Sequence, residues 1–285
     1  MRPLVLKLGG ELLETAEQRA RIALLARSIT GQRSLVVVHG GGRAIDTELA
    51  RRQIAPKKID GLRVTDRATL DAVVAVLAGS ANTDLVAALV AESVAAVGLT
   101  GVDAGLGRAT RVSAHRATDG SVVDLGFVGD PVDADPSLVR LLLAHHYVPV
   151  IASIGLGDRT EAAASGRPDV LNVNADVMAC RIAAALEKCD LVIAGGTAGV
   201  LDDDGATVAQ LDTDGIEELI AAKTATAGMV AKLSACRTAL AAGVSRIRII
   251  DGRGLDGMHD VDAAPGTLLT MTAAVSSPGT LVPPF

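Results

Sequence analysis

The chain has 285 residues, of which 49% are hydrophobic and 1% aromatic, and its formal net charge at pH 7 is −6. This length and apolar content are enough for one large α/β domain or two lobes around an aliphatic core. The shortage of aromatic rings for base stacking and the negative net charge argue against nucleic acid as a partner.

The cysteine pattern favours a reducing compartment. Cys180, Cys189 and Cys236 are an odd number with no CxxC spacing, which argues against a disulfide framework and a zinc ribbon. No signal peptide and no membrane-spanning stretch is recognised, so no membrane partner is expected. We therefore predict a cytoplasmic protein.

Short apolar runs alternate with longer stretches of helical spacing along the chain. The strand-like runs lie at residues 4–8, 34–38, 95–98, 147–153, 190–194 and 246–250, and the helical stretches at 14–29, 43–53, 66–77, 81–94, 136–145, 176–187, 214–222 and 229–241. This alternation predicts a largely parallel sheet covered by helices, with ligands at the carboxyl ends of the strands. We place a lobe boundary near residue 189.

Two of the strand-like runs lead directly into glycine motifs, KLGG at 7–10 and HGGG at 39–42. Successive backbone N–H groups in such a turn bind anions, and a neighbouring lysine adds a positive charge suited to phosphate. Glycines at strand ends also serve simple tight turns, which is the alternative for either motif alone. Together the motifs indicate phosphoryl chemistry.

Arg63 lies in GLRVT at 61–65, where its guanidinium could bind a substrate carboxylate through two parallel N–H bonds. The alternative is a solvated surface arginine.

In NVNAD at 172–176, Asn172, Asn174 and Asp176 alternate, so an extended segment would place all three on one face, where they could bind a small polar substrate and orient lysines. Helix capping is the alternative for one or two of them.

Lys232 closes GMVAK at 228–232, about one turn inside a helical pattern. An exposed helix lysine is the ordinary alternative.

The chain has no GxxxxGK[ST] loop, no GxGxxG opening a helix after a strand and no GxSxG elbow, and its histidines lack metal-ligand spacing. We expect no metal-ligating residues.

Taken in order, KLGG, HGGG, GLRVT, AGSAN at 78–82, NVNAD and GMVAK resemble the amino-acid kinase family over nearly the whole chain. The resemblance implies an open αβα sandwich with a largely parallel central sheet. Residues 1–189 would form an N-terminal lobe for acetylated amino-acid binding and dimerisation, and residues 190–285 a C-terminal lobe for ATP binding. A homodimer using ATP and Mg²⁺ would phosphorylate the side-chain carboxylate of N-acetyl-L-glutamate in arginine biosynthesis.

The resemblance also implies roles for individual residues. Lys7 and Lys232 would stabilise the transferring phosphoryl group, and Asp176 would hold both lysines. The implied phosphate contacts are Gly9, Gly10 and Gly41. The implied substrate contacts are Gly41, Gly42, Arg63, Asn172 and Asn174. The implied nucleotide contacts are Gly196, Thr197, Gly199, Leu201, Thr224 and Thr226. The acceptor is already a carboxylate, so no general base and no catalytic histidine is required.

The chain departs from the family pattern after the first strand of the C-terminal lobe. The family usually shows Ser or Thr followed by Asp there, whereas this chain has Gly195 and Gly196. Backbone groups of residues 196–201 are then the expected nucleotide contacts. Two alternatives are a kinase for an N-blocked diacid one carbon longer and a non-catalytic regulatory relative. The presence of all three charged residues, Lys7, Asp176 and Lys232, counts against the second.

Overall fold

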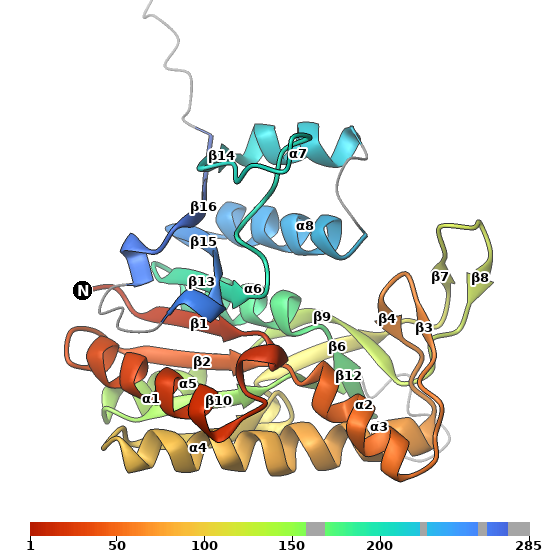
Figure 1. Cartoon of the computed structure of the whole chain (residues 1–285), viewed down its shortest axis with the longest axis horizontal. Coiled ribbons are helices and arrows are strands. Elements are labelled where there is room, and N and C mark those ends of the chain that lie inside the picture. Colours follow the sequence, from red (N-terminus) through yellow and green to blue (C-terminus); the bar gives the residue numbers. More distant parts are fainter. Residues whose placement is uncertain (158–168, 223–226, 256–260, 273–285) are drawn as a thin grey trace, which may run out of the picture.

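The computed structural model describes residues 1–157, 169–222, 227–255 and 261–272, and a sheet of eight strands forms its centre (Figure 1). The strand order is β14-β16-β15-β13-β1-β2-β10-β5, and only the neighbours β15 and β16 run antiparallel. The bounds are β1 Leu4–Leu8, β2 Leu35–His39, β5 Ala96–Thr100, β10 Val148–Ala152, β13 Asp190–Gly195, β14 Gln210–Asp212, β15 Arg246–Asp251 and β16 Gly266–Thr270. The predicted largely parallel sheet is confirmed, and six of its strands match the apolar runs.

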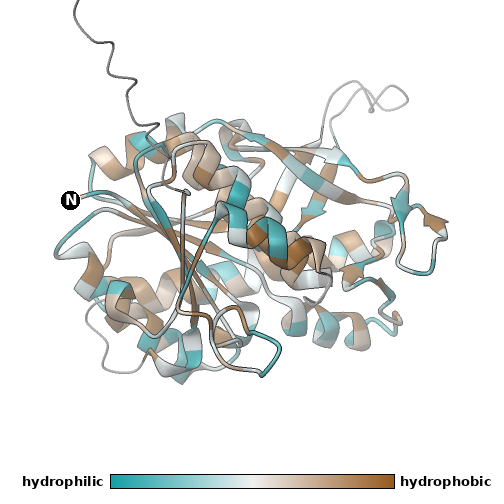
Figure 2. Cartoon of the chain, turned by 90° about the horizontal axis from the view of Figure 1, so that it is seen from above, coloured by the Kyte–Doolittle hydropathy of each residue, from teal (hydrophilic) through white to brown (hydrophobic). Residues whose placement is uncertain are grey.

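Side-chain alternation along the strands explains the layers. Leu4, Leu6 and Leu8 of β1 pack on one face of the sheet, in a cluster with residues of α1 (Ala16–Thr30) and α4 (Asn82–Ala91). Val5 points to the other face, in a cluster with residues of α6 (Ala175–Leu186) and α8 (Ala227–Ala241). Hydrophobic residues run along the strands in the middle of Figure 2, whereas the helices around them carry both hydrophobic and hydrophilic stretches. This arrangement confirms the αβα sandwich.

Four of the described helices begin where the sequence supplies N-terminal caps. Thr15 and Gln18 form a reciprocal capping box at α1, and Asp66, Asn174 and Asp212 accept backbone N–H bonds at α3, α6 and α7. The remaining bounds are α2 Gly42–Arg51, α3 Arg67–Val74, α5 Ser137–Ala144 and α7 Thr213–Ala221. All lie close to the predicted helical stretches.

The stretches predicted as separate helices at 66–77 and 81–94 form one continuous helical run, Arg67–Ala91. α3 and α4 join through the π-type turn η2 (Ala75–Ala81), with a kink at Gly79. The most apolar 18-residue window of the run Arg67–Ala91 has a mean hydropathy of 1.8, and by length and composition alone this run could cross a membrane. Within the chain, 33% of that window is buried. Core helices of soluble proteins meet the same criterion.

A small four-stranded barrel adjoins the sheet, in the order β11-β12-β9-β6. Its strands are β6 Gly107–Arg111, β9 Val128–Ala134, β11 Ile154–Gly157 and β12 Val170–Val173. Two hairpins stand beside it, β3 (Lys58–Ile59) with β4 (Leu62–Arg63), and β7 (His115–Arg116) with β8 (Val122–Val123). The sequence did not predict these strands. The barrel places the end of β12 directly before α6.

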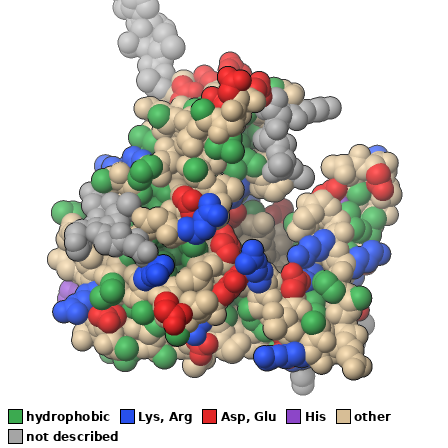
Figure 3. Space-filling view, in the orientation of Figure 1, with side chains coloured by type: hydrophobic (Ala, Val, Ile, Leu, Met, Phe, Trp, Pro, Cys, Tyr) green, Lys and Arg blue, Asp and Glu red, His purple; other side chains and the backbone are tan. Residues whose placement is uncertain are grey.

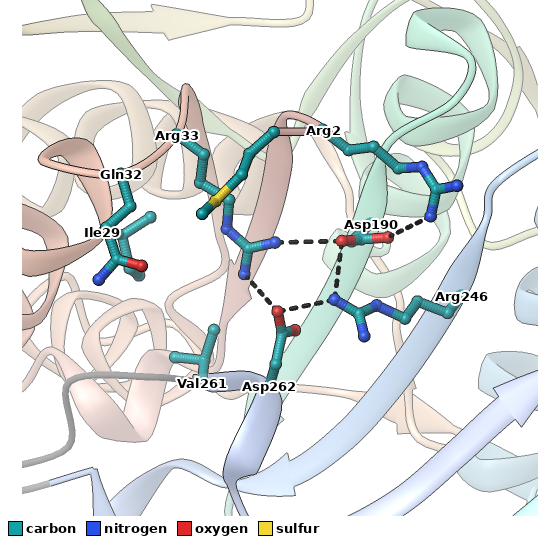
Figure 4. Close-up of a pocket in the computed structure, with 9 residues that line it drawn as sticks. Arg2, Ile29, Gln32, Arg33, Asp190, Arg246, Val261 and Asp262 are labelled. Carbon is teal, nitrogen blue, oxygen red and sulfur yellow. Dashed lines mark hydrogen bonds and ion pairs between the residues drawn. The ribbon is translucent and has the colours of Figure 1, made fainter.

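At the amino-terminal ends of β13 and β15, an ion-pair network joins distant parts of the chain (Figure 4). Asp190 lies 3.1 Å from guanidinium nitrogens of both Arg33 and Arg246. Asp262, in the short turn η5 (Val261–Ala263), lies 3.1 Å from Arg33 and 2.7 Å from Arg246. Since β13 also pairs with β1, both predicted lobes contribute strands to the same sheet. The division at residue 189 remains a prediction.

Candidate active site

Both glycine motifs lie at the carboxyl-terminal end of the sheet, because β1 and β2 are parallel neighbours with Leu8 opposite His39. Gly9 leads into the short turn η1 (Gly10–Leu12), and Gly41 is the N-cap of α2. A Cβ on Gly10 would come within 2.7 Å of the Gly41 Cα, so the close approach of the two turns requires glycine. Among the described residues, no side chain caps the α2 N-terminus. Its first N–H groups are therefore available to an anion.

Lys7 and Lys232 converge on Asp176. Lys7 points from β1 toward α6, and its Nζ lies 2.7 Å from Asp176 Oδ1. Lys232 Nζ, on α8, lies 3.6 Å from Asp176 Oδ2, because α8 packs along α6. The Lys232 side chain is 14% exposed, so the alternative of a solvated helix lysine is wrong. Residues far apart in the sequence thus form one cluster of net positive charge.

The charge state of Asp176 follows from its surroundings. Burial by itself would raise the pKa of this carboxyl, but the charges of Lys7 and Lys232 outweigh burial and hold the pKa below its usual value. Asp176 is therefore ionised at neutral pH. It fixes two ammonium groups near the glycine turns, where they can stabilise negative charge on a phosphoryl group.

His39 and Asn82 fix the second glycine motif. His39 is fully buried, with Nδ1 3.1 Å from the Gly40 carbonyl and Nε2 3.0 Å from Asn82 Nδ2. Asn82 also donates to the Val150 carbonyl at 2.9 Å. Burial lowers the pKa of His39, so the imidazole is neutral, and donation from Nδ1 leaves Nε2 to accept from Asn82. Both side chains position the glycine turn.

Arg63 belongs to a buried network rather than to the solvated surface, so the surface alternative is wrong. Its side chain is 7% exposed, and Nη1 lies 2.6 Å from Asp46 Oδ1 while Nη2 donates to the Gly42 carbonyl at 3.2 Å. Thr65 Oγ1 donates to the Arg63 carbonyl at 2.8 Å and accepts from Asn172 Nδ2 at 3.2 Å. The structure therefore brings Arg63 and Asn172 together through Thr65.

The condition for placing Asn172, Asn174 and Asp176 on one face, an extended segment, is met only as far as Asn174. Strand β12 ends at Val173, and Asn174 is the N-cap of α6, accepting N–H bonds from Asp176 at 2.8 Å and Val177 at 3.2 Å. The capping alternative is therefore correct for Asn174, because its carboxamide oxygen caps the helix α6. The turn into the helix, rather than strand alternation, directs Asp176 toward the lysines.

Only two of the six predicted nucleotide contacts line a cleft in the described part of the chain. Gly196 and Thr197 follow β13 and line a cleft. Gly199 has a φ of +132° and packs against Thr267, whose Oγ1 accepts from the Val200 N–H at 2.8 Å, so this glycine also serves the local fold. Leu201 is 47% exposed. Thr224 and Thr226 lie outside the described residues.

The cleft lies between the glycine turns and the end of β13, and its volume is about 730 Å³. Its lining includes Glu11, Gly42, Asp46 and Lys58 together with Gly196, Thr197 and Arg253. Acidic and basic side chains gather in the middle of this face of the molecule (Figure 3). Volumes of about 300–1,000 Å³ are typical of small-molecule sites.

Sequence reasoning assigned no role to several residues of the site. Asn82 and Thr65 stand in the quoted motifs AGSAN and GLRVT, so the motifs carried a signal for them. Asp46, Glu11 and Arg253 stand in none of the quoted motifs, and only the fold brings them to the cleft.

A model of the amino acid kinase family matches residues 2–251 of this chain. Acetylglutamate kinase from Symbiobacterium thermophilum is 41% identical over 259 residues, covering 88% of this chain and 85% of that protein. Acetylglutamate kinase from Stutzerimonas stutzeri is 35% identical over 280 residues, covering 94% and 90%.

Solved structures agree on the fold. The smu.665 protein from Streptococcus mutans has a TM-score of 0.74 at 27% identity, covering 95% of this chain and 99% of that one. N-acetylglutamate synthase from Neisseria gonorrhoeae, solved with coenzyme A and N-acetyl-glutamate, has a TM-score of 0.74 at 23% identity, covering 95% of this chain and 60% of that one. From the extent of the family match and the two relatives above 30% identity, the chain belongs to the amino acid kinase family.

Proposed function

We propose that this protein transfers the γ-phosphoryl group of ATP to the side-chain carboxylate of N-acetyl-L-glutamate, giving an acyl phosphate for arginine biosynthesis. The observation that carries the reaction type is the Lys7–Asp176–Lys232 cluster beside two glycine turns. The substrate is supported by the names of the two relatives, which cover most of the chain.

The residues act by positioning and charge. Phosphoryl transfer to an existing carboxylate needs no proton removal, so the site requires only alignment of the two substrates and neutralisation of the transferring group. Lys7 and Lys232 supply the positive charge, and Asp176 keeps both ammonium groups in place. Magnesium, bound with the nucleotide, would neutralise part of the phosphate charge.

The substrate-binding and nucleotide-binding residues are assigned as part of the same proposal. Gly41, Gly42, Arg63, Asn172 and Asn174 bind the acetylated substrate, and Gly9, Gly10 and Gly41 bind phosphate. Gly196, Thr197, Gly199, Leu201, Thr224 and Thr226 border the nucleotide. The Arg63–Thr65–Asn172 chain of contacts supports a shared substrate side, and the cleft position of Gly196 and Thr197 supports a nucleotide side.

The assembly and location belong to the proposal as well. We expect a cytoplasmic homodimer, with residues 1–189 as the substrate and dimerisation lobe and residues 190–285 as the ATP lobe. The three free cysteines Cys180, Cys189 and Cys236 are all buried, which agrees with a reducing compartment. Burial raises the pKa of the Cys189 thiol to about 12, so this thiol is unreactive.

Hydroxylamine trapping tests the function directly. Hydroxylamine converts an acyl phosphate into a hydroxamate, so the protein with N-acetyl-L-glutamate and MgATP should give a coloured iron–hydroxamate complex. Omission of either substrate should abolish it. The N-acetylated diacid with one more carbon should react more slowly. Faster reaction with the longer acid would identify that acid as the preferred substrate. No hydroxamate from either acid would support the non-catalytic alternative.

A further inference from the structure

The carboxylate of Glu11 lies against three glycines at the carboxyl ends of β1 and β13. A Cβ built on Gly9 would overlap this carboxylate, and a Cβ on Gly195 or Gly196 would lie 3.3 or 3.5 Å from Glu11 Oε1. The two strands are hydrogen-bonded neighbours, with the Gly9 N–H donating to the Ala194 carbonyl at 2.9 Å. The space for this carboxylate therefore exists because all three neighbours lack side chains.

The backbone of Glu11 is held firmly, whereas its carboxylate makes no direct polar contact. Glu11 lies in turn η1, next to Leu12, which is 3% exposed, and its carbonyl accepts from Gln18 Nε2 at 3.0 Å. Within the described part of the chain, its carboxylate has no hydrogen bond and no ion pair. Glu14, which lines the same cleft, instead pairs with Arg43 at 3.4 Å.

The Gly195–Gly196 segment beside the Glu11 carboxylate is also held in place. Arg253, in the turn η4 (Gly252–Gly254) after β15, donates from Nη2 to the Gly196 carbonyl at 3.0 Å and to Asp251 Oδ2 at 2.8 Å. Its charge attracts Glu11 only through space, since Asp251 holds the guanidinium. These contacts anchor the Gly195–Gly196 segment. The Glu11 carboxylate thus faces the cleft from a site whose geometry is set before a ligand binds.

A free carboxylate at this position is unfavourable for a bare polyphosphate. It stands beside the glycine turn whose N–H groups attract phosphate, so it would repel the same anion unless a cation lay between them. Mg²⁺ is commonly bound by one or two carboxylates together with substrate phosphates and water. Among the described residues, no group of three or more His, Cys, Asp or Glu forms a metal cage. One carboxylate acting with the phosphates is therefore the mode of binding that this chain offers.

From this geometry we propose that Glu11 contacts the magnesium ion of MgATP and so positions the nucleotide between η1 and Gly196. The inference rests on the proposed function, because it requires MgATP in this cleft. Glu11 is a nucleotide-positioning residue in this account, and the lysine cluster keeps its separate role at the transferring group.

Calorimetric titration of the full chain with MgATP, and with ATP in excess EDTA, tests the proposal. Glu11→Gln should weaken MgATP binding by about tenfold or more, as expected for loss of a metal contact. The same variant should bind metal-free ATP as well as or better than the parent, because a repelling charge is gone. Glu14→Gln, in the same cleft, is the matched control and should leave the ratio of the two affinities unchanged.

A relocated carboxylate provides a second test. Gly196 does not have a φ in the left-handed region, and its Cβ position is 3.5 Å from Glu11 Oε1, so Asp fits there without backbone strain. Gly196→Asp in the Glu11→Gln background should therefore recover part of the MgATP affinity. Thermal unfolding of each variant verifies that it is folded.

Three results would overturn the inference. Equal losses for MgATP and metal-free ATP in folded Glu11→Gln would show that the carboxylate supports the nucleotide or the fold rather than the metal. Unchanged affinity for both would show that it is a solvated cleft residue. Failure of the parent protein to bind MgATP would overturn the proposed function and this inference together, which separates that outcome from the other two.

Discussion

Replacement of the two site lysines should separate catalysis from stability. Lys7→Ala and Lys232→Ala should each lower kcat by about 10²–10³-fold with little change in KM, because a charge that acts mainly on the transition state is lost. Steady-state kinetics with N-acetyl-L-glutamate and MgATP measure both constants. Lys57→Ala removes an exposed lysine outside the cluster and serves as the control.

The stability losses should differ between the two variants. Coulomb attraction varies inversely with distance, so Asp176 is held about one third more strongly by Lys7 at 2.7 Å than by Lys232 at 3.6 Å. Breaking a buried pair by removing one partner costs about 3–5 kcal/mol. We expect Lys7→Ala to reach that range in urea unfolding and Lys232→Ala to fall below it.

The double variant Lys7→Ala/Asp176→Asn distinguishes the two effects. Removal of both charges should recover no more than part of the free energy of unfolding, because the Lys7–Asp176 pair no longer loses one partner alone, but Lys232 is left without Asp176. The value of kcat should stay low, because the positive charge is still missing. Unchanged kcat in either single variant would remove that lysine from the mechanism, and recovery of kcat in the double variant would show that the loss came from disturbed structure.

Three further perturbations test the surroundings of the site. Arg63→Lys should raise KM for N-acetyl-L-glutamate by about tenfold and leave KM for MgATP nearly unchanged, since lysine lacks the planar fork; equal KM values would exclude Arg63 from substrate binding. The lowered pKa of His39 means that the unfolded chain binds the extra proton, so the free energy of unfolding should fall as pH decreases below about 6.5, by at most about 1.4 kcal/mol per pH unit from this residue. Urea unfolding at pH 7.5 and 5.5 should show a smaller difference in His39→Gln, and an identical difference would contradict a neutral buried imidazole. Asp190→Asn removes one of the two carboxylates that pair with Arg33 and Arg246, and Asp262 remains, so it should lower the free energy of unfolding by less than the about 3–5 kcal/mol of an uncompensated buried charge while kcat/KM stays constant; a matching loss of kcat/KM would link the distant network to the cleft.

The central strands of the main sheet, β1, β2, β10 and β13, could be predicted because they are buried on both faces. Such strands read as short apolar runs, and the glycines or helix caps that follow them mark their ends, as at Leu4–Leu8 and Leu35–His39. The barrel strands lack this signal. β9 reads VGDPVDA, with exposed acidic residues and an internal proline, and only its pairing with β6 and β12 makes it a strand. Long-range pairing of this kind leaves little trace in local sequence.

Individual site residues could be proposed from motifs, and the family resemblance also implied that Asp176 holds Lys7 and Lys232, but the geometry that produces such contacts could not be predicted. That Lys7 meets Asp176 depends on which face of β1 the lysine occupies and on the turn at Asn174 that starts α6. The Arg63–Asp46 pair joins a hairpin to a helix whose packing no motif encodes. Motif spacing identifies candidate groups, whereas sheet register and helix packing determine which of them touch.

The missing acidic residue at position 196 shows how the fold changes the interpretation of a motif. β1 and β13 are neighbouring parallel strands, about 4.8 Å apart, so side chains that follow either strand reach the same space. Glu11 follows β1 and occupies the space beside Gly196, so this wall of the cleft still has a carboxylate. A substitution at one strand end can therefore be offset by a residue at the next, although the two positions are remote in the sequence. For the same reason, Gly196→Asp in the parent would place two carboxylates side by side, and the added acidic residue should help nucleotide binding only after Glu11 has been neutralised.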